Sequence, residues 1–196
     1  CLDYQAILKG ITDTQTRNER LEYVLKAVRM FDRKDENIGS YSGGMKQRIG
    51  IAHILLNLPR ILVVDEPTAG LDPRERIRFR NLLVELSRER IVIFSTHIIE
   101  DISSSCNQVA VINKGRLKYA GTPTEMVNLG EGFVWQFTLT TAEFEQFPHK
   151  QMITNHLREG ENIKVRAVAK DKPVPGAVNV KAHLEDAYLC LLRDIA

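Results

Sequence analysis

Apolar residues near the start of the chain recur with the period of an α-helix. Charged residues fill one face of residues 16–31, and an apolar stripe on the other face is formed by Leu21, Val24, Leu25 and Val28. This pattern predicts an amphipathic helix. Residues 2–8 show the same helical spacing, so we expect the chain to be the C-terminal portion of a longer protein that was cut within a helix.

Two short apolar runs follow a second helical segment. The second helix is predicted to begin after Ser42, a good N-cap residue, and to end near Pro59. Ile61–Val64 and Ile91–Phe94 are then predicted to be strands buried on both faces of a parallel sheet, with a helix over residues 73–88 between them. Strand, helix and strand form a βαβ unit, so the predicted fold class is α/β.

The pattern changes in the second half of the chain. Strands over residues 108–112 and 116–119 are predicted to form a hairpin, and a helix capped by Thr122 is predicted to end at Gly130. Apolar residues then alternate with more polar ones at Phe133, Trp135, Phe137 and Leu139, and again at Ile163, Val165, Ala167 and Ala169. With a third strand near residues 178–181 and a final helix, this segment predicts a small α+β appendage. We place its start between residues 124 and 132.

Composition adds few constraints on partners. The 196 residues are 43% hydrophobic and carry 27 basic against 25 acidic residues, so the chain is globular and no global field directs it toward nucleic acid or an anionic membrane. Its three cysteines form no CxxC pair, which indicates reduced thiols in a cytosolic setting. No apolar run reaches the length of a membrane span.

The candidate chemistry begins at the second helix. Ser42-Gly43-Gly44 opens this helix, and its backbone N–H groups point outward with the positive end of the helix dipole behind them. Because glycine has no Cβ, phosphate oxygens can approach these amides directly. An ordinary capped helix is the alternative for this sequence in isolation.

Acidic residues and a histidine follow the two predicted strands. Asp65 and Glu66 end the first strand, and His97 follows the second, so all three are expected at the carboxyl edge of the parallel sheet. An Asp there can hold Mg²⁺, and a neighbouring Glu can deprotonate an attacking water. Asp72 is predicted to be an N-cap and a contact residue.

Taken in order, these motifs resemble the ATP-binding cassette (ABC) ATPase family. Tyr41–Met45 resembles the signature motif, Ile61–Glu66 the Walker B strand, Ala69–Asp72 the D-loop, and His97 the switch histidine. The resemblance covers about residues 1–122 and implies a partial P-loop NTPase sheet with a helical subdomain. The implied domains are a helical, signature-bearing subdomain at 1–58, a partial ATPase core at 59–123 and an α+β accessory domain at 124–196.

The resemblance also implies a role for each motif residue. Glu66 would be the general base, His97 would sense the γ-phosphate, and Asp65 would serve Mg²⁺. The ATP held by the opposite subunit of a dimer would be contacted by Ser42, Gly43, Gly44, Met45 and Asp72. The implied cofactors of the complete protein are therefore ATP and Mg²⁺.

Two departures from the family pattern change this expectation. Tyr41 and Met45 stand where the most familiar signature has Leu and Gln, a variant that resembles exporter-type members. No GxxxxGK segment followed by Ser or Thr occurs, and no Q-loop glutamine is present, since Gln5 lies in a helix. Both elements would lie upstream of Cys1, so the chain alone is expected to be inactive.

The leading hypothesis is the ATPase subunit of a membrane exporter. Its partners would be a second ATPase subunit, in a homodimer or heterodimer, and a membrane-spanning permease that docks beside residues 1–40. The protein would be cytoplasmic and peripheral on the inner face of the membrane. The tail from Leu184 to Leu189 resembles the terminal helix of ATPases that serve drug, lipid or polysaccharide exporters.

Two alternatives stay open. One is a soluble family member that acts on ribosomes or DNA, and the other is a non-catalytic regulatory fragment. No nucleic acid is expected as a partner, because Arg74, Arg76, Arg78 and Arg80 are interpreted as a solvated helix face with few interleaved aromatic residues.

Overall fold

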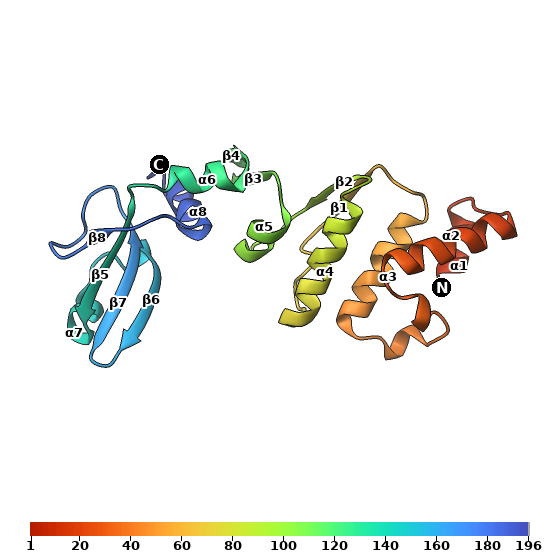
Figure 1. Ribbon diagram of the computed structural model, residues 1–196, viewed down its shortest axis with the longest axis horizontal. Helices are drawn as coiled ribbons and strands as arrows, with labels where there is room; N and C mark the ends of the chain where they lie inside the picture. Colours follow the sequence, from red (N-terminus) through yellow and green to blue (C-terminus); the bar gives the residue numbers. More distant parts are fainter. Residues whose placement is uncertain (196) are drawn as a thin grey trace. The chain divides into compact units, whose positions relative to one another are not determined.

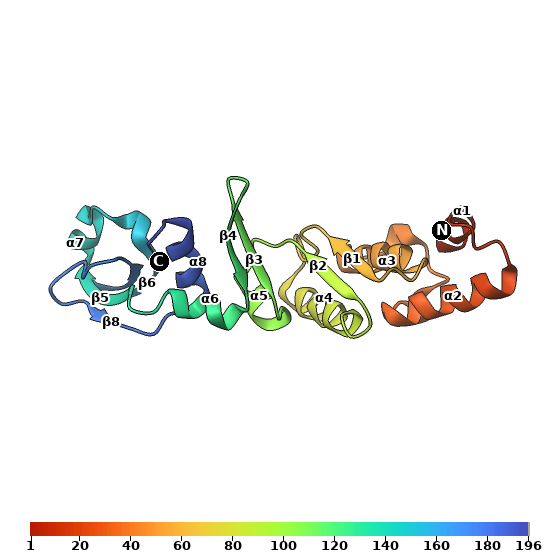
Figure 2. The same cartoon turned by 90° about the horizontal axis from the view of Figure 1, so that it is seen from above.

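The computed structural model describes residues 1–195 and divides into two compact units, Cys1–Asp101 and a unit that begins at Ile102 (Figures 1 and 2). The first unit contains helices and a parallel strand pair, and the second contains antiparallel strands with helices. The three domains implied by the sequence stay a prediction. Within residues 1–195, no helix combines the length and the apolar character needed to cross a membrane.

Helices form the N-terminal part of the first unit. They are α1 (Leu2–Leu8), α2 (Thr14–Ala27), the 3-10 turns η1 (Phe31–Arg33) and η2 (Ile38–Ser40), and α3 (Gly43–Leu55). Both longer helices were predicted. α2 begins earlier than its apolar stripe suggests, because the Asp13 side chain accepts the Thr16 N–H at 2.8 Å and caps the helix. Val24, Leu55 and Leu56 are fully buried in the core of this unit.

Two parallel strands complete the first unit. β1 (Ile61–Val64) and β2 (Ile91–Phe94) pair along their whole length and are connected by α4 (Pro73–Leu86), which confirms the predicted βαβ unit and the α/β class (Figure 1). Leu62 is fully buried and Phe79 of α4 is packed in the same core.

The prediction that both faces of these strands are buried is wrong. One face is exposed and apolar, with side chains between 53% and 66% exposed at Ile61, Val63, Ile91 and Ile93. The sheet has two strands in the described chain, and the helices contact the opposite face, from which Leu62 enters the core. Apolar β-branched residues therefore identify the strands correctly, although the described residues leave this face of the pair exposed.

A hairpin and a capped helix open the second unit. β3 (Val109–Asn113) and β4 (Arg116–Gly121) form the predicted antiparallel hairpin, and α6 (Pro123–Leu129) is the predicted capped helix (Figure 2). Its capping box is reciprocal: Thr122 Oγ1 accepts the Glu125 N–H at 3.2 Å, and Glu125 Oε2 accepts the Thr122 N–H at 2.9 Å. α5 (Ile99–Ser105) spans the boundary between the units.

A four-stranded antiparallel sheet forms the rest of the second unit, in the order β6-β7-β5-β8. The remaining elements are β5 (Val134–Thr140), α7 (Thr141–Gln146), η3 (Lys150–Met152), β6 (Ile153–Glu159), β7 (Asn162–Val168), β8 (Val178–Asn179) and α8 (Leu184–Leu192). Period-two alternation predicted β5 and β7. It could not predict β6, because this edge strand is exposed from Asn155 to Glu159 and shows no apolar alternation.

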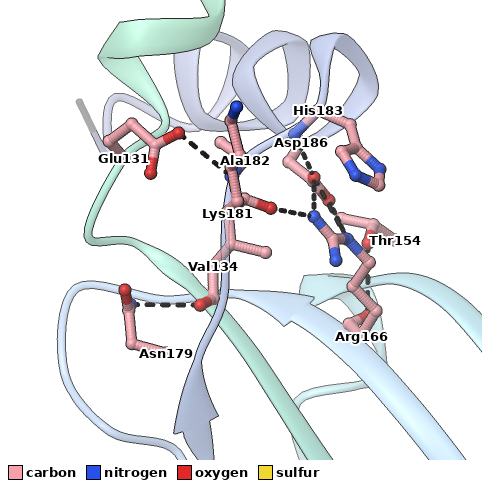
Figure 3. A network of polar contacts seen from close by, with 9 residues as sticks. All are labelled: Glu131, Val134, Thr154, Arg166, Asn179, Lys181, Ala182, His183 and Asp186. Atoms are coloured by element: carbon pink, nitrogen blue, oxygen red, sulfur yellow. Dashed lines mark hydrogen bonds and ion pairs between the residues drawn. The ribbon is translucent and has the colours of Figure 1, made fainter.

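A buried ion pair fixes α8 to this sheet (Figure 3). Arg166 of β7 donates from Nε to both oxygens of Asp186 at 3.1 Å and from Nη2 to Oδ2 at 2.7 Å, and Asp186 is 2% exposed. The His183 N–H also donates to Oδ2 at 2.8 Å. Burial raises the pKa of Asp186, but the hydrogen bonds from Arg166 and His183 outweigh burial and hold that pKa below its ordinary value.

Candidate active site

The carboxyl ends of β1 and β2 bring three predicted site residues together. Because the strands are parallel and Val64 pairs with Phe94, the residues that follow them meet at one sheet edge. Asp65 and Glu66 follow β1, and Ser95 and His97 follow β2. The expectation that His97 lies at the same edge as the two acidic residues is confirmed.

Glu66 and His97 contact each other directly. Glu66 Oε1 lies 3.0 Å from His97 Nδ1, and the two side chains are 49% and 69% exposed. Glu66 has a backbone φ of +41°, in the left-handed region that residues other than glycine rarely adopt. Such conformations concentrate at functional sites, where the surrounding structure holds them. The pair is therefore open to solvent and held in an unusual backbone geometry.

Ser95 holds both acidic residues in place. Its hydroxyl donates a short hydrogen bond to Asp65 Oδ1 and accepts the Glu66 N–H at 2.9 Å. The exposed Asp65 carboxylate is an oxygen ligand of the type that Mg²⁺ prefers. No group of three or more His, Cys, Asp and Glu side chains that could cage a metal occurs among residues 1–195. This donor set fits Mg²⁺, which is commonly held by one or two carboxylates together with water and substrate phosphates.

The N-terminus of α3 presents the second predicted site. Ser42 caps the helix, since its Oγ accepts the Met45 N–H at 3.3 Å, and Ser42 and Gly43 are both exposed. The first N–H groups of a helix have no intrahelical partner, so those of Gly43 and Gly44 are available at this end. Tyr41 is 5% exposed, and its hydroxyl donates to the Arg33 carbonyl at 2.5 Å.

Gly44 is buried rather than open to solvent. A Cβ at this position would lie 2.8 Å from Glu75 Oε2 and 3.4 Å from Glu75 Cβ, so a larger residue here would have to displace the Glu75 side chain. Glu75 also accepts from Arg48 of α3 at 2.9 Å, with both side chains largely buried. Gly44 therefore lies where the N-terminus of α3 packs against Glu75 of α4. Packing thus accounts for one of the two glycines in the Gly43-Gly44 pair.

The turn between β1 and α4 contacts α3 as well. Gln47 Nε2 donates to the Ala69 carbonyl at 3.3 Å. Asp72 is the N-cap of α4, as predicted, since its Oδ1 accepts the Glu75 N–H at 2.9 Å. Its role as a nucleotide contact, like the roles of Ser42, Gly43, Gly44 and Met45, stays a prediction.

The sequence did not indicate a buried polar cluster in the same unit. Asp101 and Thr68 are 0% and 1% exposed, and Asp101 accepts hydrogen bonds from Thr68, Thr96 and Arg80. The interpretation of Arg80 as part of a solvated helix face is therefore wrong, because its side chain is 15% exposed and ion-paired. The position of Thr96 directly before His97 is the one sequence signal that could have drawn attention to this cluster.

Comparison with known proteins connects this geometry to one family. Residues 4–69, which contain both the N-terminus of α3 and the end of β1, match the family model described as ABC transporter. The chain is 34% identical over 142 residues to YxlF, an uncharacterized ABC transporter ATP-binding protein of Bacillus subtilis (strain 168), covering 72% of this chain and 47% of that protein. It is 36% identical over 120 residues to Nod factor export ATP-binding protein I of Cupriavidus metallidurans, covering 61% of this chain and 39% of that protein.

A solved structure shares the fold. The structure of cbiO1 from Clostridium perfringens, part of the ABC transporter complex cbiONQ, matches with a TM-score of 0.57 and 32% sequence identity over 62% of this chain and 50% of that chain. The chain spans less than half the length of the two curated relatives. The chain belongs to the family of ABC transporter ATP-binding proteins.

Proposed function

We propose that the complete protein hydrolyses ATP as the ATPase subunit of a membrane transporter, and that Glu66 and His97 carry the reaction. The observation behind this proposal is the 3.0 Å contact between the two side chains, next to Asp65 at the carboxyl edge of paired parallel strands. Family membership supports it. The exposure of the pair leaves room for a nucleotide and an attacking water.

Each residue has a defined task in this proposal. Glu66 accepts the proton of the attacking water at a carboxylate oxygen. Because the ionised Glu66 carboxylate only accepts, His97 donates to it from Nδ1, and as an imidazolium His97 would also donate from Nε2 to an oxygen of the terminal phosphate. Asp65, oriented by Ser95, would hold Mg²⁺, which when bound neutralises charge that develops on the phosphates.

The N-terminus of α3 serves a second nucleotide in this proposal. The exposed Ser42 and Gly43 would offer a hydroxyl and backbone N–H groups to ATP held by the opposite subunit, with Met45 and Asp72 beside it. Gly44 is buried against Glu75, so its own contribution is an N–H group at a fixed position. Two subunits would thus form composite sites, each with the Asp65, Glu66 and His97 of one chain and the α3 N-terminus of the other.

A phosphate-binding loop outside these 196 residues completes each site. The loop's lysine and amides supply much of the electrostatic stabilisation in phosphoryl transfer, and no GxxxxGK segment occurs in this sequence. The exposed apolar face of β1 and β2 supports a further covering layer in the complete protein. We expect no measurable MgATP binding by the 196-residue chain in calorimetry at micromolar concentrations, whereas micromolar affinity would contradict the need for the loop.

A groove in the helical part of the first unit is the proposed permease site. It encloses about 490 Å³ between α1, α2 and the two 3-10 turns. Apolar side chains of the lining include Leu21, Leu25 and Phe31. Carboxylates at Asp3, Glu22, Asp35 and Glu36 also line it, and Asp3, Glu22 and Glu36 are paired with bases. An amphipathic segment of a membrane subunit fits this lining, since cytoplasmic loops carry an excess of Lys and Arg.

Export is the proposed direction of transport. It rests on Tyr41 and Met45 in the signature motif and on the similarity to the Nod factor export protein. The permease would hold the subunit at the cytoplasmic face of the membrane. Nucleic acid is not a proposed partner, because Arg78 and Arg80 of α4 already pair with Glu75 and Asp101.

Substitution of Glu66 tests the proposal. In the complete protein with its permease, Glu66→Gln is expected to lower kcat about 100- to 10,000-fold, the range of a lost general base, and to trap ATP in a closed dimer. Glu85→Gln is the matched control, since Glu85 is 44% exposed and paired with Arg29 in the same unit. Turnover equal to that of the Glu85→Gln control would remove Glu66 from the role of base.

A further inference from the structure

A buried carboxylate connects the two segments that carry Glu66 and His97. Asp101 is 0% exposed, and its Oδ2 accepts from Thr68 Oγ1 at 2.5 Å and from Thr96 Oγ1 at 3.2 Å. Its Oδ1 accepts from Arg80 Nη1 at 3.2 Å. A buried carboxylate requires such partners, because an unpaired charge away from water is strongly unfavourable.

The two threonines lie next to the candidate catalytic residues. Thr68 follows Glu66 by two positions, and Thr96 directly precedes His97. Thr96 Oγ1 also accepts the Ile98 N–H at 3.0 Å, which fixes the backbone on the other side of His97. The Glu66 and His97 side chains are themselves 49% and 69% exposed, so packing around them restrains them little. Their relative position therefore depends on how the adjacent backbone is anchored.

The backbone of Glu66 makes this anchoring necessary. Its φ of +41° is unfavourable for a residue other than glycine and persists only where neighbouring contacts over-determine it. Thr68 supplies such a contact, since it is 1% exposed and its hydroxyl makes the shortest of the hydrogen bonds to Asp101. Arg80 neutralises the carboxylate and also donates to the Glu100 carbonyl at 3.1 Å, which ties α4 to the start of α5.

We propose that Asp101 is a positioning residue, whose carboxylate sets the distance between Glu66 and His97 by holding Thr68 and Thr96. The inference rests on the proposed function for the roles of Glu66 and His97, but its geometric content is independent of that function. The Asp101 carboxylate bonds to the two threonines rather than to either side chain, and it acts through them.

The geometric content can be tested on the 196-residue chain. The ring ¹⁵N resonances of His97, assigned with a His97→Gln variant, report whether Nδ1 is hydrogen-bonded. Glu66→Gln defines the displacement expected when the carboxylate partner is altered. Thr68→Val removes the buried hydroxyl at nearly constant volume, and we expect it to move the His97 Nδ1 resonance in the same direction. Thr68→Ser keeps the hydroxyl and is expected to leave the resonance in place.

Asp186→Asn is the matched control for a general effect of losing a buried carboxylate. Asp186 is 2% exposed and paired with an arginine in the other unit, so its substitution should leave the His97 resonance unchanged. A folded Thr68→Val variant with an unshifted His97 resonance would overturn the inference. Asp101→Asn removes the proposed positioning carboxylate itself. If that variant does not fold, Thr68→Val still decides whether the threonine hydroxyl positions His97.

Turnover in the complete protein separates positioning from folding. Asp101→Asn and Thr68→Val are expected to lower kcat about 10- to 100-fold with the KM for ATP within about twofold, because misplacement by about an ångström costs that much. Thr68→Ser should restore turnover. Normal kcat in Thr68→Val, with Glu66→Gln inactive, refutes the inference alone. Normal turnover in Glu66→Gln refutes the proposed function, while the His97 resonance still tests the geometry.

Discussion

The two units each bury one aspartate against one arginine, and the partners of the two aspartates differ. Asp186 receives three contacts from Arg166, which hold α8 on the sheet, and one from the His183 N–H, which caps α8. Asp101 receives a single contact from Arg80, at 3.2 Å, and its other partners are hydroxyls. The two side chains are almost equally buried, at 2% and 0% exposure.

The difference shows that burial alone does not define the role of a carboxylate. The bidentate pair of the second unit has the geometry of a strong, charge-assisted contact and fixes secondary-structure elements to each other. The carboxylate of the first unit is bonded less completely by its arginine, and it holds loop residues next to exposed chemical groups. We therefore expect the loss of Asp186 to affect stability and the loss of Asp101 to affect the site.

Substitution of the arginine that pairs with each buried aspartate should give the largest difference in stability between the two units. Arg166→Met leaves Asp186 buried without its charged partner, and we expect the second unit to lose about 3–5 kcal/mol of its free energy of unfolding. Arg80→Met leaves Asp101 with two hydroxyl donors, so a smaller loss of about 1–3 kcal/mol is expected in the first unit.

Separate reporters can resolve the two units. Trp135 is the one tryptophan of the sequence, and its Nε1 donates to the Ala169 carbonyl at 3.1 Å, so its fluorescence reports on the second unit. Hydrogen exchange with mass spectrometry gives the stability of the first unit. Equal losses in the two variants would show that the two pairs contribute in the same way.

Much of the site followed from the sequence because it depends on strand ends. Two apolar runs separated by a helical segment predict parallel strands, and parallel strands place Asp65, Glu66 and His97 at one edge. The cap at Asp72 followed from its position before Pro73. These features depend on local patterns that a single sequence shows directly.

The buried cluster did not follow, because its residue types are those of exposed surfaces. An aspartate in the first turn of a helix is ordinarily a solvated residue that complements the helix dipole, and Asp101 has that position in α5. The sequence interpretation places the four arginines of α4 on one solvated face. Residues two apart lie on opposite sides of a helix, so Arg76 and Arg80 face inward while Arg74 and Arg78 are exposed.

Alkaline pH should lower the stability of the second unit by a moderate amount. Burial raises the pKa of Cys190 in α8 from 9.0 to about 11. A thiol with a raised folded-state pKa contributes stability that is complete below pH 9 and is lost as the pH rises toward 11. We expect the second unit to lose about 2 kcal/mol over this range by Trp135 fluorescence in denaturant titrations. Cys190→Ala should remove that slope, and an unchanged slope would assign it to another group.

Acid should produce the smallest difference, and it tests Asp186 directly. The pKa of Asp186 is held below its ordinary value of 3.8, so the stability that it contributes is present above that pH and is lost as the pH falls through the lower, folded-state value. In titrations from pH 5 downward, the second unit of the unsubstituted chain should weaken below about pH 4, followed by Trp135 fluorescence. Asp186→Asn starts from a lower stability and should show a shallower acid slope, because the amide does not titrate. Identical slopes in the two proteins would mean that the Arg166–Asp186 pair does not set the acid response, and that the contrast between the two buried aspartates is confined to what each one holds in place.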